Sequence, residues 1–210
     1  MKRTEKHFEF TGQSKVNAFG VKLYRIQCTK AVKDVNVGDL GGWIQKKKNL
    51  SGNAWVYDDS EVFGFAEVSG NAEIRDGAIV YGFAKVFDNA KVSGHADVCA
   101  HAQIFGNAEA KDKASISGRV KLFGNVKVSE KALISASAEG SDNAKIFGNS
   151  WVTDSAKISG NAEVSGNAIV SNCEVSGRAK VYGFAELSEN ISGSMEVFGS
   201  DLLMEEAYKC

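Results

Sequence analysis

Three histidines are the side chains best suited to acid–base chemistry in this chain. His95 and His101 lie six residues apart, and His7 lies near the start of the sequence. An imidazole titrates near neutral pH, so His95 or His101 could act as a general base that deprotonates an acceptor hydroxyl or amine. No second catalytic group lies close to either one in the sequence. We therefore predict no cofactor and no metal, although neighbouring chains of a trimer could bring histidines together.

The cysteines show no pattern of a metal site. Cys28, Cys99, Cys173 and Cys210 lie far apart, without the close pairs that zinc sites use. The segment from Met1 to Lys6 has no apolar stretch behind it, so no signal peptide is expected. We predict free thiols in a reducing cytoplasm.

Composition excludes several classes of partner. The net charge is −1, which provides no general attraction to nucleic acid or to an anionic membrane surface. No apolar run is long enough to cross a bilayer. The interactions of the protein must therefore come from particular surfaces, and these depend on the elements that position them.

A six-residue repeat covers more than half of the sequence. An aliphatic residue returns at every sixth position from Leu50 to Val170, and a small residue follows four positions after each. This period is typical of a solenoid. We interpret the deviations as compensating core packing. They are Ala110 and Gly140 in the aliphatic series and Val120 and Val126 in the small series.

A longer period gives the number of faces in each coil. One corner position is asparagine at every eighteenth residue, and eighteen residues make three faces of six. The sequence therefore predicts an all-β, triangular parallel β-helix with 18-residue coils. Glycine and asparagine suit the corners because they tolerate left-handed backbone angles, and stacked asparagines can hydrogen-bond along the rod. The asparagines are Asn53, Asn71, Asn89, Asn107, Asn125, Asn143 and Asn161.

The paired small and aliphatic positions, over roughly residues 50 to 200, resemble the hexapeptide-repeat superfamily of left-handed β-helices. The left hand is implied by this resemblance. One departure is that glycine stands one place later than usual, as in Val68-Ser69-Gly70. The segment from Gly38 to Gly64 is similar to the first coil of a subgroup of bacterial and phage hexapeptide proteins. Some of that subgroup are labelled acyltransferases from their fold alone.

Three segments are expected along the chain. Residues 1–48 alternate polar and apolar side chains and should form an N-terminal β cap that protects the edge of the first coil. Residues 49–199 form the solenoid. Residues 200–210 have helical spacing of Leu202, Leu203 and Ala207, and should form a short capping helix.

Outward positions predict two aromatic or apolar surfaces. An exposed apolar patch marks an interface or a covered surface, so the first is either a contact with a second copy or partner, or a surface under residues 1–48. Its residues are Phe63, Phe65, Ile79, Tyr81 and Phe83, with Leu133, Trp151 and Ile169 further along the same face. The second is a ladder that serves either cross-strand stabilisation or binding. Its residues are Phe87, Phe105 and Phe123.

The first hypothesis is a non-catalytic interaction or scaffold protein that binds itself and a protein partner through a flat face. The family resemblance implies that a trimer is common, and we expect a dimer or trimer. The phage-like segment extends the hypothesis to an accessory protein that blocks a host defence protein. One alternative is an acyl-CoA-dependent acyltransferase that uses His95 or His101. The other is a structural component of a larger particle, which would assemble openly instead of as a closed oligomer.

Overall fold

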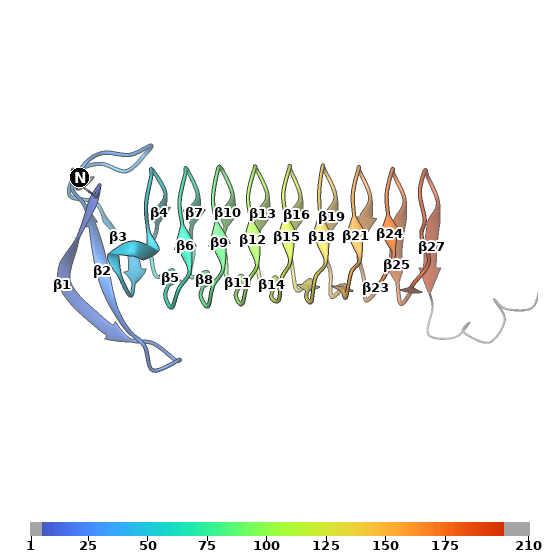
Figure 1. The fold of residues 1–210 in the computed structure, drawn as a ribbon, viewed down its shortest axis with the longest axis horizontal. Coiled ribbons are helices and arrows are strands. Elements are labelled where there is room, and N and C mark those ends of the chain that lie inside the picture. The colour runs from blue at the N-terminus through green and yellow to red at the C-terminus, as the bar shows by residue number, and fades with distance from the viewer. Residues whose placement is uncertain (1–5, 200–210) are drawn as a thin grey trace, which may run out of the picture.

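The computed structural model describes residues 6–199, which form a rod of stacked coils with one coil beside the next along a single axis (Figure 1). Three sheets of 11, 9 and 7 strands run along the rod. Successive coils pair in parallel at a spacing of eighteen residues, as Lys91 does with Glu109. The predicted all-β, triangular parallel β-helix is confirmed.

Most strands are two residues long and belong to one of three stacks. The 11-stranded sheet consists of β1 (Phe8–Val16), β2 (Lys22–Cys28), β3 (Leu40–Ile44), β5 (Glu61–Val62), β8 (Ile79–Val80), β11 (Asp97–Val98), β14 (Ser115–Ile116), β17 (Leu133–Ile134), β20 (Trp151–Thr153), β23 (Ile169–Ser171) and β26 (Glu186–Leu187). The 9-stranded sheet consists of β4 (Trp55–Val56), β7 (Glu73–Ile74), β10 (Lys91–Val92), β13 (Glu109–Ala110), β16 (Lys127–Val128), β19 (Lys145–Ile146), β22 (Glu163–Val164), β25 (Lys180–Gly183) and β27 (Glu196–Gly199). The 7-stranded sheet consists of β6 (Glu67–Val68), β9 (Lys85–Val86), β12 (Gln103–Ile104), β15 (Lys121–Leu122), β18 (Glu139–Gly140), β21 (Lys157–Ile158) and β24 (Glu174–Val175).

The corners turn at the residue two places after each inward aliphatic. This residue has a positive φ throughout the regular coils, for example 68° at Gly70 and 58° at Asp88. The corner asparagines were expected to share this role, but Asn71 and the rest of its column are absent from the positive-φ residues. They instead form the expected side-chain ladder, in which Asn71 Nδ2 donates to Asn89 Oδ1 at 3.1 Å.

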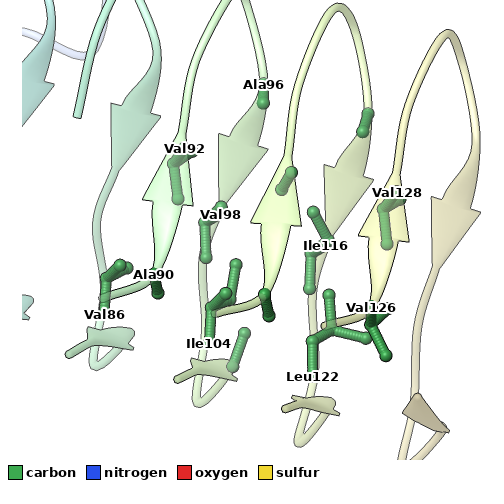
Figure 2. Packing of buried hydrophobic residues seen from close by; sticks show 14 of the residues in the cluster. Val86, Ala90, Val92, Ala96, Val98, Ile104, Ile116, Leu122, Val126 and Val128 are labelled. Carbon is green, nitrogen blue, oxygen red and sulfur yellow. The ribbon is translucent and has the colours of Figure 1, made fainter. Parts of the chain in front are cut away.

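Small and aliphatic side chains fill the interior of the rod, as Figure 2 shows for Ala90, Val92 and Ile104. Gly140 stands where the repeat has an aliphatic residue, and larger side chains of the neighbouring coil compensate for the lost volume. A Cβ placed on Gly140 would lie 2.9 Å from Leu122 Cδ2 and 3.3 Å from Val126 Cγ1, so these two larger side chains occupy the space that glycine leaves. Interiors packed to this density respond to a change of a single methyl group.

The N-terminal cap supplies the hydrogen bonds that the first coil cannot make with a preceding coil. Backbone N–H groups donate to the following coil, as Trp55 N does to Ala72 O, so the first coil has free carbonyls. Lys6 Nζ donates to Leu50 O at 2.7 Å, and the buried His7 ring lies with Nε2 3.0 Å from Ala54 O. Burial lowers the pKa of His7, which keeps this imidazole neutral at physiological pH.

The cap continues one sheet and forms ion pairs with a second. Strands β1 and β2 form an antiparallel hairpin, and β3 joins them to β5, so the cap extends the 11-stranded sheet. A single turn of 3₁₀ helix, η1 (Lys47–Asn49), leads into the first coil. On the 9-stranded sheet, Lys33 pairs with Glu73 at 2.8 Å and Arg75 pairs with Asp34 at 3.4 Å.

The repeat shortens near the C-terminal end without breaking the stack. Lys157 pairs with Glu174, one residue short of the usual eighteen, and Ile191 forms a bridge with Val175 only sixteen residues later. The missing residues come from the corners, because the sheet registers continue. The capping helix expected at 200–210 lies outside the described residues.

The fit around Gly140 predicts an energetic coupling. Gly140→Val should destabilise the fold by about 1–3 kcal/mol, because added methyl groups collide with Leu122 and Val126. Val126→Ala should relieve that collision, so the double variant should lose less stability than the two single variants together. Chemical denaturation of the four proteins measures this coupling. Strict additivity would show that Val126 does not fill the space beside Gly140.

Candidate functional site

The outward columns of the 11-stranded sheet form in the expected register. Leu133 pairs with Trp151, and Trp151 pairs with Ile169. Ile79 pairs with Asp97 one strand before Ser115. All of the apolar residues predicted for this face therefore lie along one side of the rod or at its adjoining corner.

The cap hairpin covers the first part of this face. The Phe19 ring lies 5.4 Å from the Phe63 ring and 5.1 Å from the Tyr81 ring, measured between centroids. Phe63 is only 5% exposed and packs with Leu23 and Trp43. Of the two alternatives left open for this patch, coverage by residues 1–48 therefore holds for Phe63, because residues of the cap fold back over it. Ile79 and Tyr81 lie at the margin of this contact and are half-buried.

Phe65 and Phe83 remain exposed at the corner beside the covered residues. Their exposed fractions are 55% and 50%. The two rings stack 5.0 Å apart at 5°, and His101 continues the stack 4.9 Å from Phe83 at 7°. These three side chains form a continuous column of rings on consecutive coils.

Eight side chains further along the 11-stranded sheet form an uncharged surface that we call the neutral face. They project from β14, β17, β20 and β23 or from the residue directly after the strand, and these strands lie beyond the cap contacts described above. The residues are Ser115, Ser117, Leu133, Ser135, Trp151, Thr153, Ile169 and Ser171. The equivalent positions of the other two sheets carry lysine or glutamate on nearly every strand.

Trp151 is the largest exposed side chain of the neutral face. It is 41% exposed, and its indole Nε1 donates to Ser135 Oγ at 3.0 Å. Ser135 Oγ in turn donates to Thr153 Oγ1 at 3.0 Å. These bonds hold the indole ring against the preceding coil and leave much of its apolar surface in water.

The second aromatic ladder lies on the side of the 7-stranded sheet. Phe87 and Phe105 stack 4.9 Å apart at 2°, and Phe105 and Phe123 stack 5.3 Å apart at 11°. All three rings are half-buried because each covers part of the next. The stacking satisfies the expectation of cross-strand contact, while a binding role for this ladder stays a prediction.

The two candidate general bases stand at different corners, on either side of β11. The His101 ring is occupied by its stack with Phe83, and the His95 ring lies beside Gly77. Neither ring is held by a side-chain hydrogen bond within residues 6–199. A search of the same residues finds no group of three or more His, Cys, Asp and Glu side chains that could hold a metal ion.

A titratable cluster that the sequence did not indicate lies between the cap and the neutral face. Burial raises the pKa of Asp97, although a hydrogen bond from Tyr81 opposes the shift, and Asp97 Oδ1 is buried without a partner. Burial also raises the pKa of Cys99, so its thiol stays protonated and is a weak nucleophile.

Asp97 should make stability depend on pH. A folded-state pKa above the unfolded value means that its contribution is most favourable in acid and is lost as pH rises through the folded pKa. Asp97→Asn should therefore raise the melting temperature at pH 7 and should change it little at pH below about 4.

The exposed Asp76 provides a matched control for that experiment, since Asp76→Asn changes the same charge in the same solenoid. Thermal unfolding monitored by circular dichroism at both pH values measures the effect. An Asp97→Asn protein that is no more stable than the wild type at pH 7 would contradict an energetic penalty from the buried carboxylate.

Comparisons with known proteins add no assignment to this geometry. No family model matches the chain, and no curated protein matches its sequence. Within residues 6–199, no helix is long and apolar enough to cross a membrane.

Proposed function

We propose that this protein is a non-catalytic interaction protein that associates through the neutral face of its 11-stranded sheet. The observation that carries the proposal is that Trp151 is 41% exposed and lies in an uncharged surface that spans four successive strands. Cores of protein interfaces are depleted in charge and enriched in aromatic residues, and tryptophan is frequent among the residues that dominate binding energy.

The partner that we propose first for this face is a second copy of the chain. Two uncharged flat surfaces can meet without like-charge repulsion, and a face that meets its own copy forms a closed, symmetric dimer. The resemblance to hexapeptide-repeat left-handed β-helices supports a trimer as the other closed form. Association through either of the other two faces would bury lysine and glutamate side chains, and the desolvation of those charges is costly.

The area of the neutral face limits how strongly it can bind alone. Four strands about 4.8 Å apart, each face about five residues wide, give an area of roughly 300 Å². A stable interface buries about 800 Å² on each partner. The interface must therefore include the adjoining corners, where Lys113 and Lys131 flank one edge and Ser137 flanks the other.

The proposal extends to a protein partner other than a second copy. A rigid rod can cover an active site or an assembly surface of a larger protein without chemistry of its own. The similarity of the segment from Gly38 to Gly64 to phage hexapeptide proteins supports a host defence protein as that partner. Free thiols at Cys28, Cys99 and Cys173 support a reducing cytoplasm as the compartment.

Substitution of Trp151 tests the proposal. Trp151→Glu places a charge in the neutral face and should lower the average mass toward that of the monomer, with at least a tenfold weaker association. Light scattering across a range of concentrations measures the mass. Phe147→Glu is the matched control, because Phe147 is a half-exposed aromatic residue of the same coil outside the neutral face.

The same samples should be titrated with acetyl-CoA in a calorimeter. We expect the protein to be a defined oligomer that gives no heat with acetyl-CoA. We also expect Trp151→Glu to dissociate that oligomer. Saturable acetyl-CoA binding that is lost in His95→Ala or His101→Ala would favour the acyltransferase alternative. An oligomer that grows without limit as concentration rises would favour a structural component of a larger particle.

A further inference from the structure

A second surface combines exposed aromatic rings with positive charge at one corner of the rod. We call it the corner ridge and define it by Lys46, Lys48, Phe65, Phe83, His101 and Arg119. The four residues from Phe65 onward occupy the same corner of successive coils. Each backbone N–H donates to the carbonyl of the residue just before its equivalent in the next coil, as Phe65 N does to Gly82 O. The rings of the ridge precede the neutral face along the rod, and Arg119 stands at the corner beside the first strand of that face.

The lysines at the start of the ridge are directed toward its first ring. Lys46 Nζ lies 5.1 Å and Lys48 Nζ lies 4.9 Å from the centroid of Phe65. Such contacts between an ammonium group and a ring face are attractive, and they keep both charges close to the apolar surface. The exposed side chain of Arg119 stands at the other end, one coil beyond His101.

The charge of the ridge is not cancelled by the acidic residues nearest to it. Glu67 pairs with Lys85 at 3.5 Å, and Glu139 pairs with Lys121 at 3.7 Å. Within residues 6–199, Lys46, Lys48 and Arg119 form no ion pair of their own. The ridge is therefore locally positive on a chain whose net charge is −1.

The orientation of the rings decides which ligand fits. Phe65, Phe83 and His101 stack face to face with interplanar angles of 5° and 7°, and the lysines cover the free face of Phe65. A nucleic acid base needs an open ring face for stacking, and here both faces of Phe65 and of Phe83 are occupied. The ring edges are what remain open to solvent, and ring edges carry partial positive charge.

We propose that the corner ridge binds an extended acidic segment of a partner protein, with apolar side chains against Phe65 and Phe83 and carboxylates against the lysines and Arg119. The distance from Phe65 to Arg119 is three coil spacings, or about 14 Å. A chain in extended conformation covers that distance with about four to five residues. The site adjoins the neutral face at Arg119, and its three rings lie on earlier coils, outside that face.

A labelled peptide tests the proposal directly. The probe is a fluorescein-labelled hexapeptide, Asp-Asp-Leu-Phe-Asp-Asp, titrated with the full chain and followed by fluorescence anisotropy at low ionic strength. Saturable binding that weakens as salt rises is expected. Lys48→Glu with Arg119→Glu should weaken binding at least tenfold, and Phe65→Ser with Phe83→Ser should do the same by removing the apolar edges.

Lys111→Glu with Arg178→Glu is the matched control, because it reverses one lysine and one arginine that are exposed elsewhere on the solenoid. This control should bind the peptide as the wild type does, and circular dichroism should show all variants to be folded. Equal weakening in the control would overturn the proposal by showing a general charge effect. Absence of saturable binding by the wild type, or displacement of the peptide by an oligodeoxythymidine, would overturn it as well.

Discussion

Backbone hydrogen bonds between successive coils are the interaction on which the rest of this structure depends. Backbone N–H groups of every regular coil donate to the coil that follows, as Glu73 N does to Ala90 O at 3.0 Å, while many small residues after a corner donate within their own coil, as Ala72 N does to Ser69 O. This ladder fixes the distance between coils, and it places each outward side chain beside the residue eighteen positions away. The surface is therefore organised in columns, and each column consists of the side chains at one repeat position in successive coils.

The same ladder explains why the two ends need different treatment. A stack of coils in one direction leaves carbonyls free at its start, and the cap meets them with donors from Lys6 and His7. The cap hairpin also extends one sheet and reaches over its outer face, where Phe19 covers Phe63. Coverage by the cap divides that face into an early, internal contact and a later, open surface around Trp151.

Periodicity made the coil predictable, because an inward position that recurs every sixth residue has only one role. It also placed Trp151 correctly on the open face. The covering of Phe63 by Phe19 was left open, since the cap follows no repeat and its contacts depend on tertiary packing. The partly buried carboxylate of Asp97 was missed because an acidic residue in an outward column is normally solvated. The repeat period alone does not predict the neutral face or the corner ridge as binding sites, because the period specifies only which residues are neighbours within the rod.

The central claim is that the neutral face around Trp151 is an interface, and the solvent accessibility of that indole tests it most directly. Trp43 and Trp55 are 9% and 1% exposed, whereas Trp151 is 41% exposed, so acrylamide quenching of tryptophan fluorescence reports mainly on Trp151. Quenching should be measured over the same concentrations as the mass. If the neutral face is the interface, quenching should fall as the oligomer forms. An oligomer in which Trp151 is quenched as readily as in the monomer, or a chain that stays monomeric throughout, would contradict it.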